Sequence, residues 1–162
     1  MNKNVIVNAS PLIVLVKSDL AFLLPKIYET IIVPKGVFDE IMAGKPNDPA
    51  RHILPKLDWL IKKPAFAVEG TVEKFDLGRG ESEVISLGLE TENSIVMMDD
   101  AAARDAARQL SLQVIGTGGF LAIASRRGLI ESFPDALRSV QTSGLWLSPT
   151  LIELLIELES RP

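Results

Sequence analysis

The sequence predicts an α/β fold built on a parallel β-sheet, and three observations support this class. Short apolar runs at 5–7, 30–33 and 94–98 have the length and composition of strands that are buried on both faces. Segments with helical spacing separate these runs, and regular alternation of strand and helix is typical of a parallel sheet. With 162 residues, of which 47% are hydrophobic, the chain is long enough for one domain with a buried core and too short for two ordinary ones. We therefore expect one domain over 1–162.

The N-terminal half predicts two strands that are each followed by a helix. Ser10 is a good N-cap and Pro11 a good first helical residue, so the first strand should lead directly into a helix. Pro34 closes the second strand and starts the next helix, which carries Glu40 beside its apolar face. We expect, in order, a strand at 5–7, a helix from 11 to about 18, an apolar segment at 20–24, a strand at 30–33 and a helix from 34 to about 43.

The C-terminal half continues the same alternation after a weakly patterned stretch. Four prolines break up 45–70, where the sequence predicts only a loop, a short helix and a strand near 59–62. Beyond it we expect a helix at 81–90, a strand at 94–98, a helix at 101–110, a strand at 114–115 and helices at 118–127, 134–142 and about 149–159. Apolar residues cover most of the circumference of the last helix, so it either packs in the core on two sides or forms an oligomer contact. Core packing is the commoner case for such residues.

Composition excludes several kinds of chemistry. The net charge of −4 argues against coating nucleic acid by bulk electrostatics. There is no cysteine, and His52 is the only histidine, so thiol nucleophiles, thiolate zinc sites and multi-histidine zinc sites are excluded. No apolar run approaches the length of a membrane span, and the default expectation is a soluble cytoplasmic protein. Any catalysis must rest mainly on carboxylates, hydroxyls and bound metal.

Acidic residues occur in three separate places that this fold could bring together. These are Glu40, Glu81 with Glu83, and the pair Asp99-Asp100 at the end of a buried strand. Carboxylates held within a few ångströms of one another repel unless a cation neutralises them, so a cluster predicts a metal. Mg²⁺ or Mn²⁺ bound by two or three carboxylates can activate water for hydrolysis of a phosphodiester.

Each of these residues also has a plain structural interpretation. Acids on helices are most often solvated surface residues, and one member of the Asp99-Asp100 pair could simply be the N-cap of the next helix. Arg104 and Arg108 share a helical face and could meet a phosphate backbone, although such pairs are more often surface residues. The glycine-rich stretch at 116–119 could cradle a phosphate, but turn glycines are the better interpretation.

Several motifs together resemble one known family. They are Val5 to Ile13, the helix from Val33-Pro34 to Glu40-Ile41, Gly80 to Ile85, Met98-Asp99-Asp100 through Arg104, and Gly116 to Gly119. In order and spacing they resemble the PIN-domain superfamily, in particular its branch of short prokaryotic proteins described as predicted nucleic-acid-binding, which are relatives of VapC-type toxins. The resemblance covers nearly the whole chain. It implies a three-layer α/β/α sandwich around a parallel sheet and an Mg²⁺- or Mn²⁺-dependent ribonuclease site built from three or four acids.

Carried over by position, the resemblance assigns Glu40, Glu81 and Asp99 as metal ligands. Asp100 would support the site or accept a proton through water. The family's first acid, normally aspartate, falls on Asn8, which with Ser10 would form the wall of the site. The resemblance also implies a small antitoxin partner, and commonly a homodimer, for which the last helix and the 20–24 segment are the candidate contacts.

The preferred function is a metal-dependent endoribonuclease of toxin-antitoxin type that acts on single-stranded RNA. Asn8 leaves three accounts open: weak metal binding, a non-cleaving relative, or an engineered inactive form of a toxic nuclease. The alternative function is a non-catalytic PIN-like module that binds RNA or protein. A receiver-like signalling domain fits poorly, because its acidic pair would lie near the first strand, which here ends in Asn8.

Overall fold

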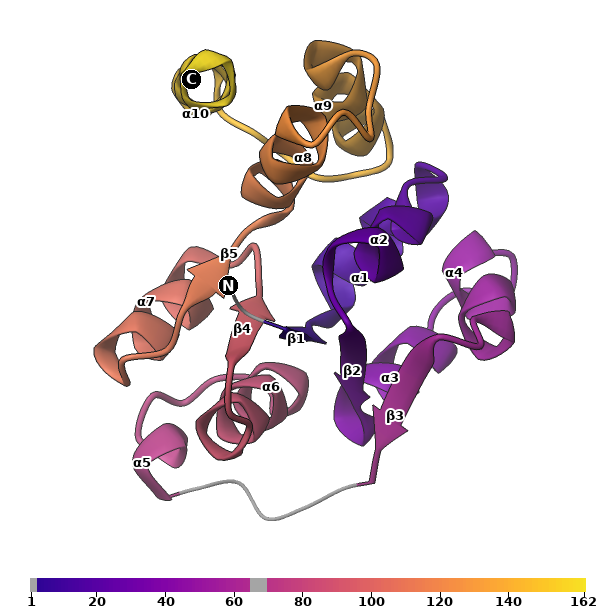
Figure 1. Cartoon of the computed structure of the whole chain (residues 1–162). Helices are drawn as coiled ribbons and strands as arrows, with labels where there is room; N and C mark the ends of the chain where they lie inside the picture. Colours follow the sequence, from indigo (N-terminus) through magenta and orange to yellow (C-terminus); the bar gives the residue numbers. More distant parts are fainter. Residues whose placement is uncertain (1–2, 65–69) are drawn as a thin grey trace.

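The computed structural model of the chain describes residues 3–64 and 70–162. Within them, five strands form one all-parallel sheet in the order β3-β2-β1-β4-β5 (Figure 1). The strands are β1 (Asn4–Val7), β2 (Thr30–Pro34), β3 (Leu60–Lys63), β4 (Ser94–Met97) and β5 (Val114–Ile115). This arrangement confirms the predicted α/β class.

Helices connect the strands and flank the sheet. They are α1 (Ala9–Lys17), η1 (Ala21–Leu23), α2 (Leu24–Ile27), α3 (Lys35–Met42), α4 (Pro49–Ile53), η2 (Leu54–Lys56), α5 (Gly70–Glu73), α6 (Arg79–Glu90), α7 (Ala101–Gln109), α8 (Thr117–Arg126), α9 (Phe133–Thr142) and α10 (Pro149–Ser160). None of the helices in the described part of the chain is long and apolar enough to cross a membrane.

The order of the strands creates a switch point between β1 and β4. The chain builds outward from β1 to β2 and β3, and α5 and α6 then carry it back past β1 to β4 and β5. In open parallel sheets, ligands bind outside the carboxyl ends of the strands where the direction of winding reverses. Asn8 follows β1 and Asp99-Asp100 follow β4, so the fold places both polar segments at this crevice.

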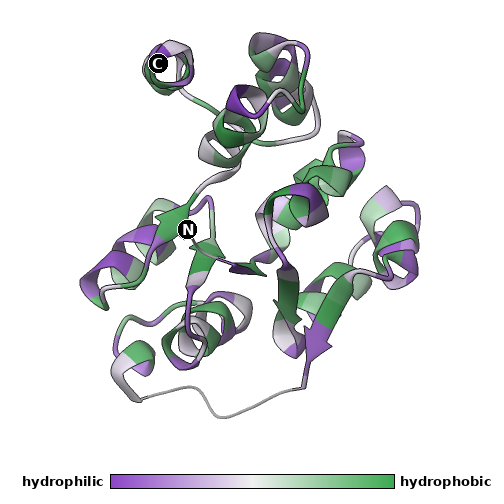
Figure 2. Ribbon diagram, viewed as in Figure 1, coloured by the Kyte–Doolittle hydropathy of each residue, from purple (hydrophilic) through white to green (hydrophobic). Residues whose placement is uncertain are grey.

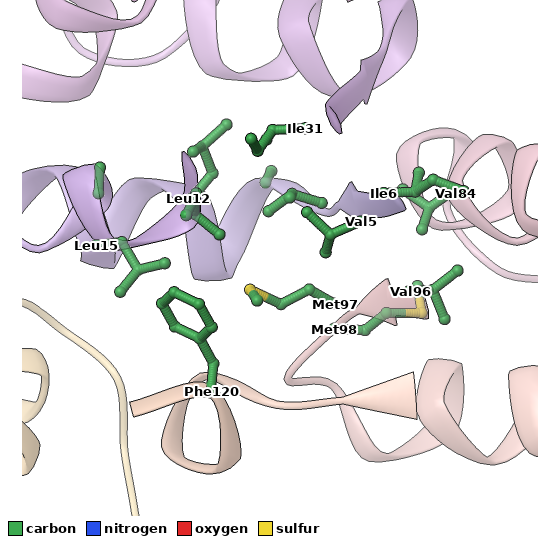
Figure 3. Close-up of a cluster of buried hydrophobic side chains, with 14 of the residues drawn as sticks. Val5, Ile6, Leu12, Leu15, Ile31, Val84, Val96, Met97, Met98 and Phe120 are labelled. Atoms are coloured by element: carbon green, nitrogen blue, oxygen red, sulfur yellow. The ribbon is translucent and has the colours of Figure 1, made fainter. Parts of the chain in front are cut away.

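The register between β1 and β4 explains why both strands are apolar after their first residues, Asn4 and Ser94. Val5 pairs with Ile95 and Ile6 with Val96, and successive side chains point to opposite faces. Figure 3 shows Leu12, Leu15 and Phe120 near Met97 on one side of the sheet, and Val84 of α6 near Ile6 on the other. The members of this core that Figure 3 labels are all at most 1% exposed. Helices therefore cover both faces of the central strands.

The outer strand β3 has a different composition. Its last residues, Lys62 and Lys63, are exposed and give the strand a hydrophilic end in Figure 2. Lysines on an edge strand discourage pairing with the edge of another sheet.

Two sequence predictions need correction. Helix α1 begins at Ala9 rather than after Ser10, because the Asn8 amide still donates to Met97 O in the β-ladder at 3.0 Å and Asn8 is itself the N-cap residue. The last helix buries only Leu155 fully and leaves Leu154, Ile156 and Leu158 exposed, so the expected packing on two sides is wrong. The other helices with predicted limits start and end within two residues of those limits.

Candidate active site

A cavity of about 560 Å³ opens beside the carboxyl end of β1. Four of its polar side chains come from three elements that are distant in sequence: Asn8 and Ser10 from the start of α1, Glu40 from α3 and Glu81 from α6. The rest of the lining is Ala9, Ile13, Val14, Gly78, Gly80, Ser143 and Gly144. We call this space the acidic pocket. It brings together four of the residues that the sequence assigned to the site.

Asn8 contributes an oxygen atom that has no partner. The residue is 5% exposed, and its side-chain Oδ1 is buried without a hydrogen bond. Leaving a buried acceptor unsatisfied costs about 1–3 kcal/mol, so such an atom is rarely found without a functional or solvent partner. In the acidic pocket, Asn8 therefore offers a free oxygen ligand.

Gly80 keeps the space between these oxygens open. A Cβ at this position would lie 3.6 Å from Glu40 Oε2 and 3.7 Å from Asn8 Oδ1, and 3.3 Å from the Val37 side chain. Glycine thus lets the backbone of α6 approach α3 and the end of β1 closely. A larger side chain would stand directly between the two oxygen atoms.

Glu81 shows the electrostatic character of the pocket. Burial raises the pKa of the Glu81 carboxyl, the negative charge of Asp100 raises it further, and Glu40 acts in the same direction. A hydrogen bond with the Gly78 backbone opposes these effects. The negative charges of two other carboxylates therefore act on Glu81, and a cation bound among the three would reduce their repulsion.

Asp100 combines a structural role with a place near this cluster. Its Oδ2 accepts a hydrogen bond from the Ala103 amide at 3.0 Å, so Asp100 is the N-cap of α7. The sequence left open which member of the acid pair caps this helix, and the structure selects Asp100. The side chain still acts on Glu81, as the raised pKa of that group shows.

Asp99 points elsewhere. Its Oδ1 accepts from the Thr117 amide at 2.8 Å, and its Oδ2 accepts from Thr117 Oγ1 at 2.6 Å. These bonds fasten the end of β4 to the first turn of α8, where the dipole of the helix also favours a negative charge. Asp99 does not line the acidic pocket but a second cavity, described below. The amide at 117, which a bound phosphate could have used, is already occupied by this carboxylate.

Glu83 is also separated from the acidic pocket. It is 2% exposed and packs over Gly36 of α3, where an added Cβ would overlap the Glu83 carboxylate. Arg79 Nε lies 3.5 Å from Glu83 Oε2, and Arg79 Nη1 lies 3.8 Å from Asp39 Oδ2. These charges join α3 to α6, the two helices that carry Glu40 and Glu81. Glu83 thus helps to fix the relative positions of Glu40 and Glu81 without lining the pocket itself.

The two predicted nucleic-acid-binding arginines differ in their surroundings. Arg104 lines the second cavity, and its Nε is buried with no hydrogen-bond partner. Arg108 is exposed one turn further along α7. Both border a shallow depression on the outside of α7 together with Ala101, Ala102 and Asp105.

Sequence reasoning missed the segment at 143–147. Ser143 and Gly144 line the acidic pocket, and Leu145, Trp146 and Leu147 line the second cavity. The segment joins α9 to α10, and only its position in the fold brings it to the site. A tryptophan two residues after a helix-ending glycine was the one local signal that could have drawn attention to it.

The oxygen donors of the acidic pocket suit a hard divalent cation. Carboxylates and a carboxamide oxygen are ligands that Mg²⁺ and Mn²⁺ accept, with water completing the shell. Within residues 3–64 and 70–162, no three His, Cys, Asp or Glu side chains are gathered closely enough to coordinate one ion directly. The chemistry of the donor set and the unpartnered Asn8 oxygen therefore fit such an ion, with water between the ion and part of the carboxylates.

Comparison with protein families matches residues 4–160 to DUF3368, a family described as a PIN domain. No curated protein and no solved structure matches the chain.

Proposed function

The chain belongs to the PIN-domain family DUF3368, and from this premise we propose that it is a metal-dependent endoribonuclease of toxin-antitoxin type that cleaves single-stranded RNA. The observation that carries the proposal is the convergence of Asn8, Glu40 and Glu81 on one pocket, with Asp100 close enough to raise the pKa of Glu81. Clustered carboxylates of this kind are the usual ligands of ions that assist phosphoryl transfer.

Mg²⁺ or Mn²⁺ would be held by Glu40, Glu81 and Asp100 together with the free Oδ1 of Asn8. When bound, the ion supplies Lewis acidity toward a phosphoryl oxygen and a lower pKa for its bound water. We assign Asp100 to this set because its charge acts on Glu81, whereas Asp99 lines the second cavity and is held there by two hydrogen bonds from Thr117. Asp99 acts as a positioning residue, since it fixes the turn from which Asp100 projects.

The protein's own groups account for the other steps. Glu81 lines the pocket in which an attacking water would lie, and its carboxylate can accept a proton from that water when it is ionised. Ser10 lines the same pocket and can donate a hydrogen bond to a phosphate oxygen. Water attacks phosphorus directly, the bond to the leaving oxygen breaks, and no covalent bond to the protein forms.

The acidic pocket can be tested by cleavage of a mixed single-stranded RNA with Mg²⁺ or Mn²⁺, with and without a chelator. We expect Glu81→Gln to abolish cleavage and Asn8→Asp to increase it, because the second change adds a negative ligand beside Glu40. Glu131→Gln, at an exposed position outside the pocket, is the matched control and should cleave like the parent protein. Cleavage that survives both Glu81→Gln and the chelator would overturn the assignment.

A second candidate function is a PIN-like module that binds RNA or protein without cutting it. The neutral Asn8 side chain favours this second function, because its buried Oδ1 carries no negative charge for a metal ion. RNA binding that persists in chelator, with no cleavage by either the parent protein or Asn8→Asp, would identify this function.

The resemblance to toxins also supports two proposals about partners. We propose a small antitoxin that covers the acidic pocket, whose carboxylates call for a basic side chain. We also propose a homodimer. Helix α10 is its candidate contact, because Leu154, Ile156 and Leu158 are exposed along it.

A further inference from the structure

A second cavity, of about 230 Å³, lies next to the acidic pocket. Its polar side chains are Asp99 and Arg104, and apolar side chains form most of the remaining wall. These are Val114, Ile115, Leu145, Trp146, Leu147, Leu151 and Leu155. The volume is below the usual 300–1,000 Å³ of sites for drug-sized ligands, so the cavity suits one small group.

Neighbouring stretches of the chain line the two cavities, although no single residue lines both. Asp100 acts on the acidic pocket, and its neighbour Asp99 lines the second cavity. The segment at 143–147 contributes Ser143 and Gly144 to the first and its next three residues to the second. An extended chain that crosses the acidic pocket can therefore reach the second cavity with an adjacent unit.

Arg104 and Asp99 give the cavity a donor beside an acceptor. A Cβ at Gly116 would lie 3.2 Å from Arg104 Nη1 and 3.2 Å from Asp99 Oδ1, so glycine at this position leaves room for both groups. Arg104 Nε is buried without a partner, and buried donors in native structures nearly always have one. Because Arg104 lines the cavity, a ligand with hydrogen-bond acceptors on a flat edge can meet the accessible end of the guanidinium.

Trp146 supplies a flat apolar surface at the cavity. Its side chain is 79% exposed, the highest value among the exposed large hydrophobic residues of the described chain. Exposed aromatic rings beside a cationic group are the platforms on which single-stranded nucleic acids stack their bases. Leu145 and Leu147, on either side, hold the segment against the core.

We propose that the second cavity binds one nucleobase of the RNA, with Trp146 stacked on its face and Arg104 donating to its edge. Arg108, one turn along α7, is placed to contact a neighbouring phosphate. The choice of RNA as the ligand rests on the proposed function, whereas the base site itself requires binding and not cleavage.

Fluorescence of Trp146 provides the first test. Trp59 is the only other tryptophan and is partly buried against the core, so Trp59→Phe leaves Trp146 as the sole indole. In the presence of chelator, we expect saturable quenching by a short single-stranded RNA and none by a ribose-phosphate chain of equal length without bases. Equal quenching by both chains, or quenching by an apolar peptide alone, would overturn the proposal.

Affinity provides the second test. Stacking on an aromatic residue contributes about 1–3 kcal/mol per base, so Trp146→Ala should weaken RNA binding about 5- to 150-fold. Trp146→Phe should retain much of the affinity. Phe22→Ala is the control, because Phe22 is 52% exposed on η1 and lines neither cavity. Unchanged affinity in Trp146→Ala would exclude the base site.

The arginines separate base recognition from charge. Arg104→Met should reduce discrimination among homopolymeric RNAs, because methionine has no hydrogen-bond donor for the base edge. Arg108→Gln should weaken all sequences equally and reduce the salt dependence of binding.

The outcomes distinguish this site from the nuclease proposal. Base-dependent quenching without any metal-dependent cleavage would retain the base site and reject the nuclease. Metal-dependent cleavage by a protein whose RNA affinity is unchanged in Trp146→Ala would retain the nuclease and reject the base site.

Discussion

The side-chain oxygen of Asn8 is buried at the acidic pocket without a hydrogen bond, and the neighbouring side chains of the pocket are acceptors. Glu40 and Glu81 line the same space and cannot donate a hydrogen bond to it when ionised. The backbone amide of Asn8 donates a hydrogen bond to Met97 O and holds the residue in place. Its side-chain oxygen is left to bind a cation or water.

Adding a negative charge at Asn8 should increase the affinity for a metal ion and the stability of the folded protein when the ion is present. We expect Mn²⁺ to raise the unfolding midpoint of Asn8→Asp more than that of the parent protein, because a ligand that binds only the folded state stabilises it by mass action, about 2.7 kcal/mol at 100 times its Kd. Without metal, the same variant should be less stable, since it adds a fourth carboxylate. Thermal unfolding with and without chelator measures both effects, and equal metal-induced shifts would contradict the expectation.

Glu81 makes the stability of the fold depend on pH. Because the pKa of Glu81 is raised in the folded state, the folded protein holds this proton when the unfolded chain has released it. Stability from this group therefore falls as pH rises from the ordinary value of 4.5 through the raised value. Glu81→Gln should match the parent protein below pH 4.5 and be more stable above that window, in metal-free buffer. A Glu81→Gln variant that is less stable than the parent protein at pH 7 would contradict this expectation.

Tyr28 gives a direct optical test of the core. It is the only tyrosine, and burial raises its pKa from 10.0 to about 12, against the opposing charge of Arg127. Its ring stacks on Phe120 with the centroids 6.2 Å apart. The tyrosinate absorbance of the folded protein should therefore rise only near pH 12, while the unfolded chain titrates near 10. Stability is lost across that interval, because the unfolded state releases the proton first. A folded protein, verified by circular dichroism, that titrates at 10 would refute this.

At the scale of elements, the packing of α3 on α6 sets the distance between Glu40 and Glu81. Gly36 is the point of closest approach, and Glu83 lies over it with 2% exposure. The pairs Lys35 with Asp39 and Arg79 with Asp39 extend the contact toward solvent. Charged side chains at the rim and a carboxylate at the centre thus fix one orientation of the two helices.

Gly36→Ala should separate these helices. Overpacking a buried contact costs about 1–3 kcal/mol, and we expect a loss of stability of that size in urea unfolding. Gly70→Ala is the control, because no heavy atom lies within 4 Å of an added Cβ there. The loss should be smaller when Glu83→Ala is combined with Gly36→Ala than in the sum of the two single variants. Strict additivity would show that the two residues do not meet.

The strands and most helices could be predicted because local pattern determines them. The runs at 5–7 and 94–98 are apolar because both faces of their strands are covered, and Gly128 and Gly144 follow helices with positive φ angles of 74° and 116°. The start of α1 could not be predicted, since Ser10 and Asn8 are both good N-caps and the β-ladder at Asn8 selects between them. The sheet order also required the structure.

The sequence was enough to expect Asn8, Ser10, Glu40 and Glu81 close together, but not the separate surroundings of Asp99 and Asp100. Alternation of strand and helix was enough to expect Glu40, Glu81 and the acid pair near one sheet edge. The orientation of the acid pair depends on Thr117, which lies 18 residues beyond Asp99. Thr117 donates hydrogen bonds to both carboxylate oxygens of Asp99. No local rule contains such a contact, and the same applies to Trp146, which reaches the site only through the path of α9.

At the scale of the whole molecule, α10 is a helix with one covered side. Leu155 packs against Gly118 of α8, where an added Cβ would lie 2.6 Å from its Cδ1, and this contact holds the helix in place. Leu154 and Leu158 are 48% and 41% exposed. A pair of α10 helices from two copies would cover these side chains.

The proposed dimer predicts a change in mass on substitution of this surface. Leu154→Lys combined with Leu158→Lys should convert dimers to monomers without unfolding, because neither residue belongs to the buried core. Leu129→Lys, at a residue that is 36% exposed after α8, is the control and should leave the dimer intact. Sedimentation velocity distinguishes the species. A parent protein that sediments as a monomer at all concentrations would reject the dimer.

The segment at 143–147 lines both cavities, so a ligand that moved it at one cavity would also change the shape of the other. A group that displaces the backbone at Gly144 on filling the acidic pocket also moves Trp146 and its neighbours at the second cavity. By thermodynamic linkage, if the first ligand changes the affinity for the second by some factor, the second changes the affinity for the first by the same factor. The two cavities, although built from different helices, would respond to their ligands as one cooperative unit.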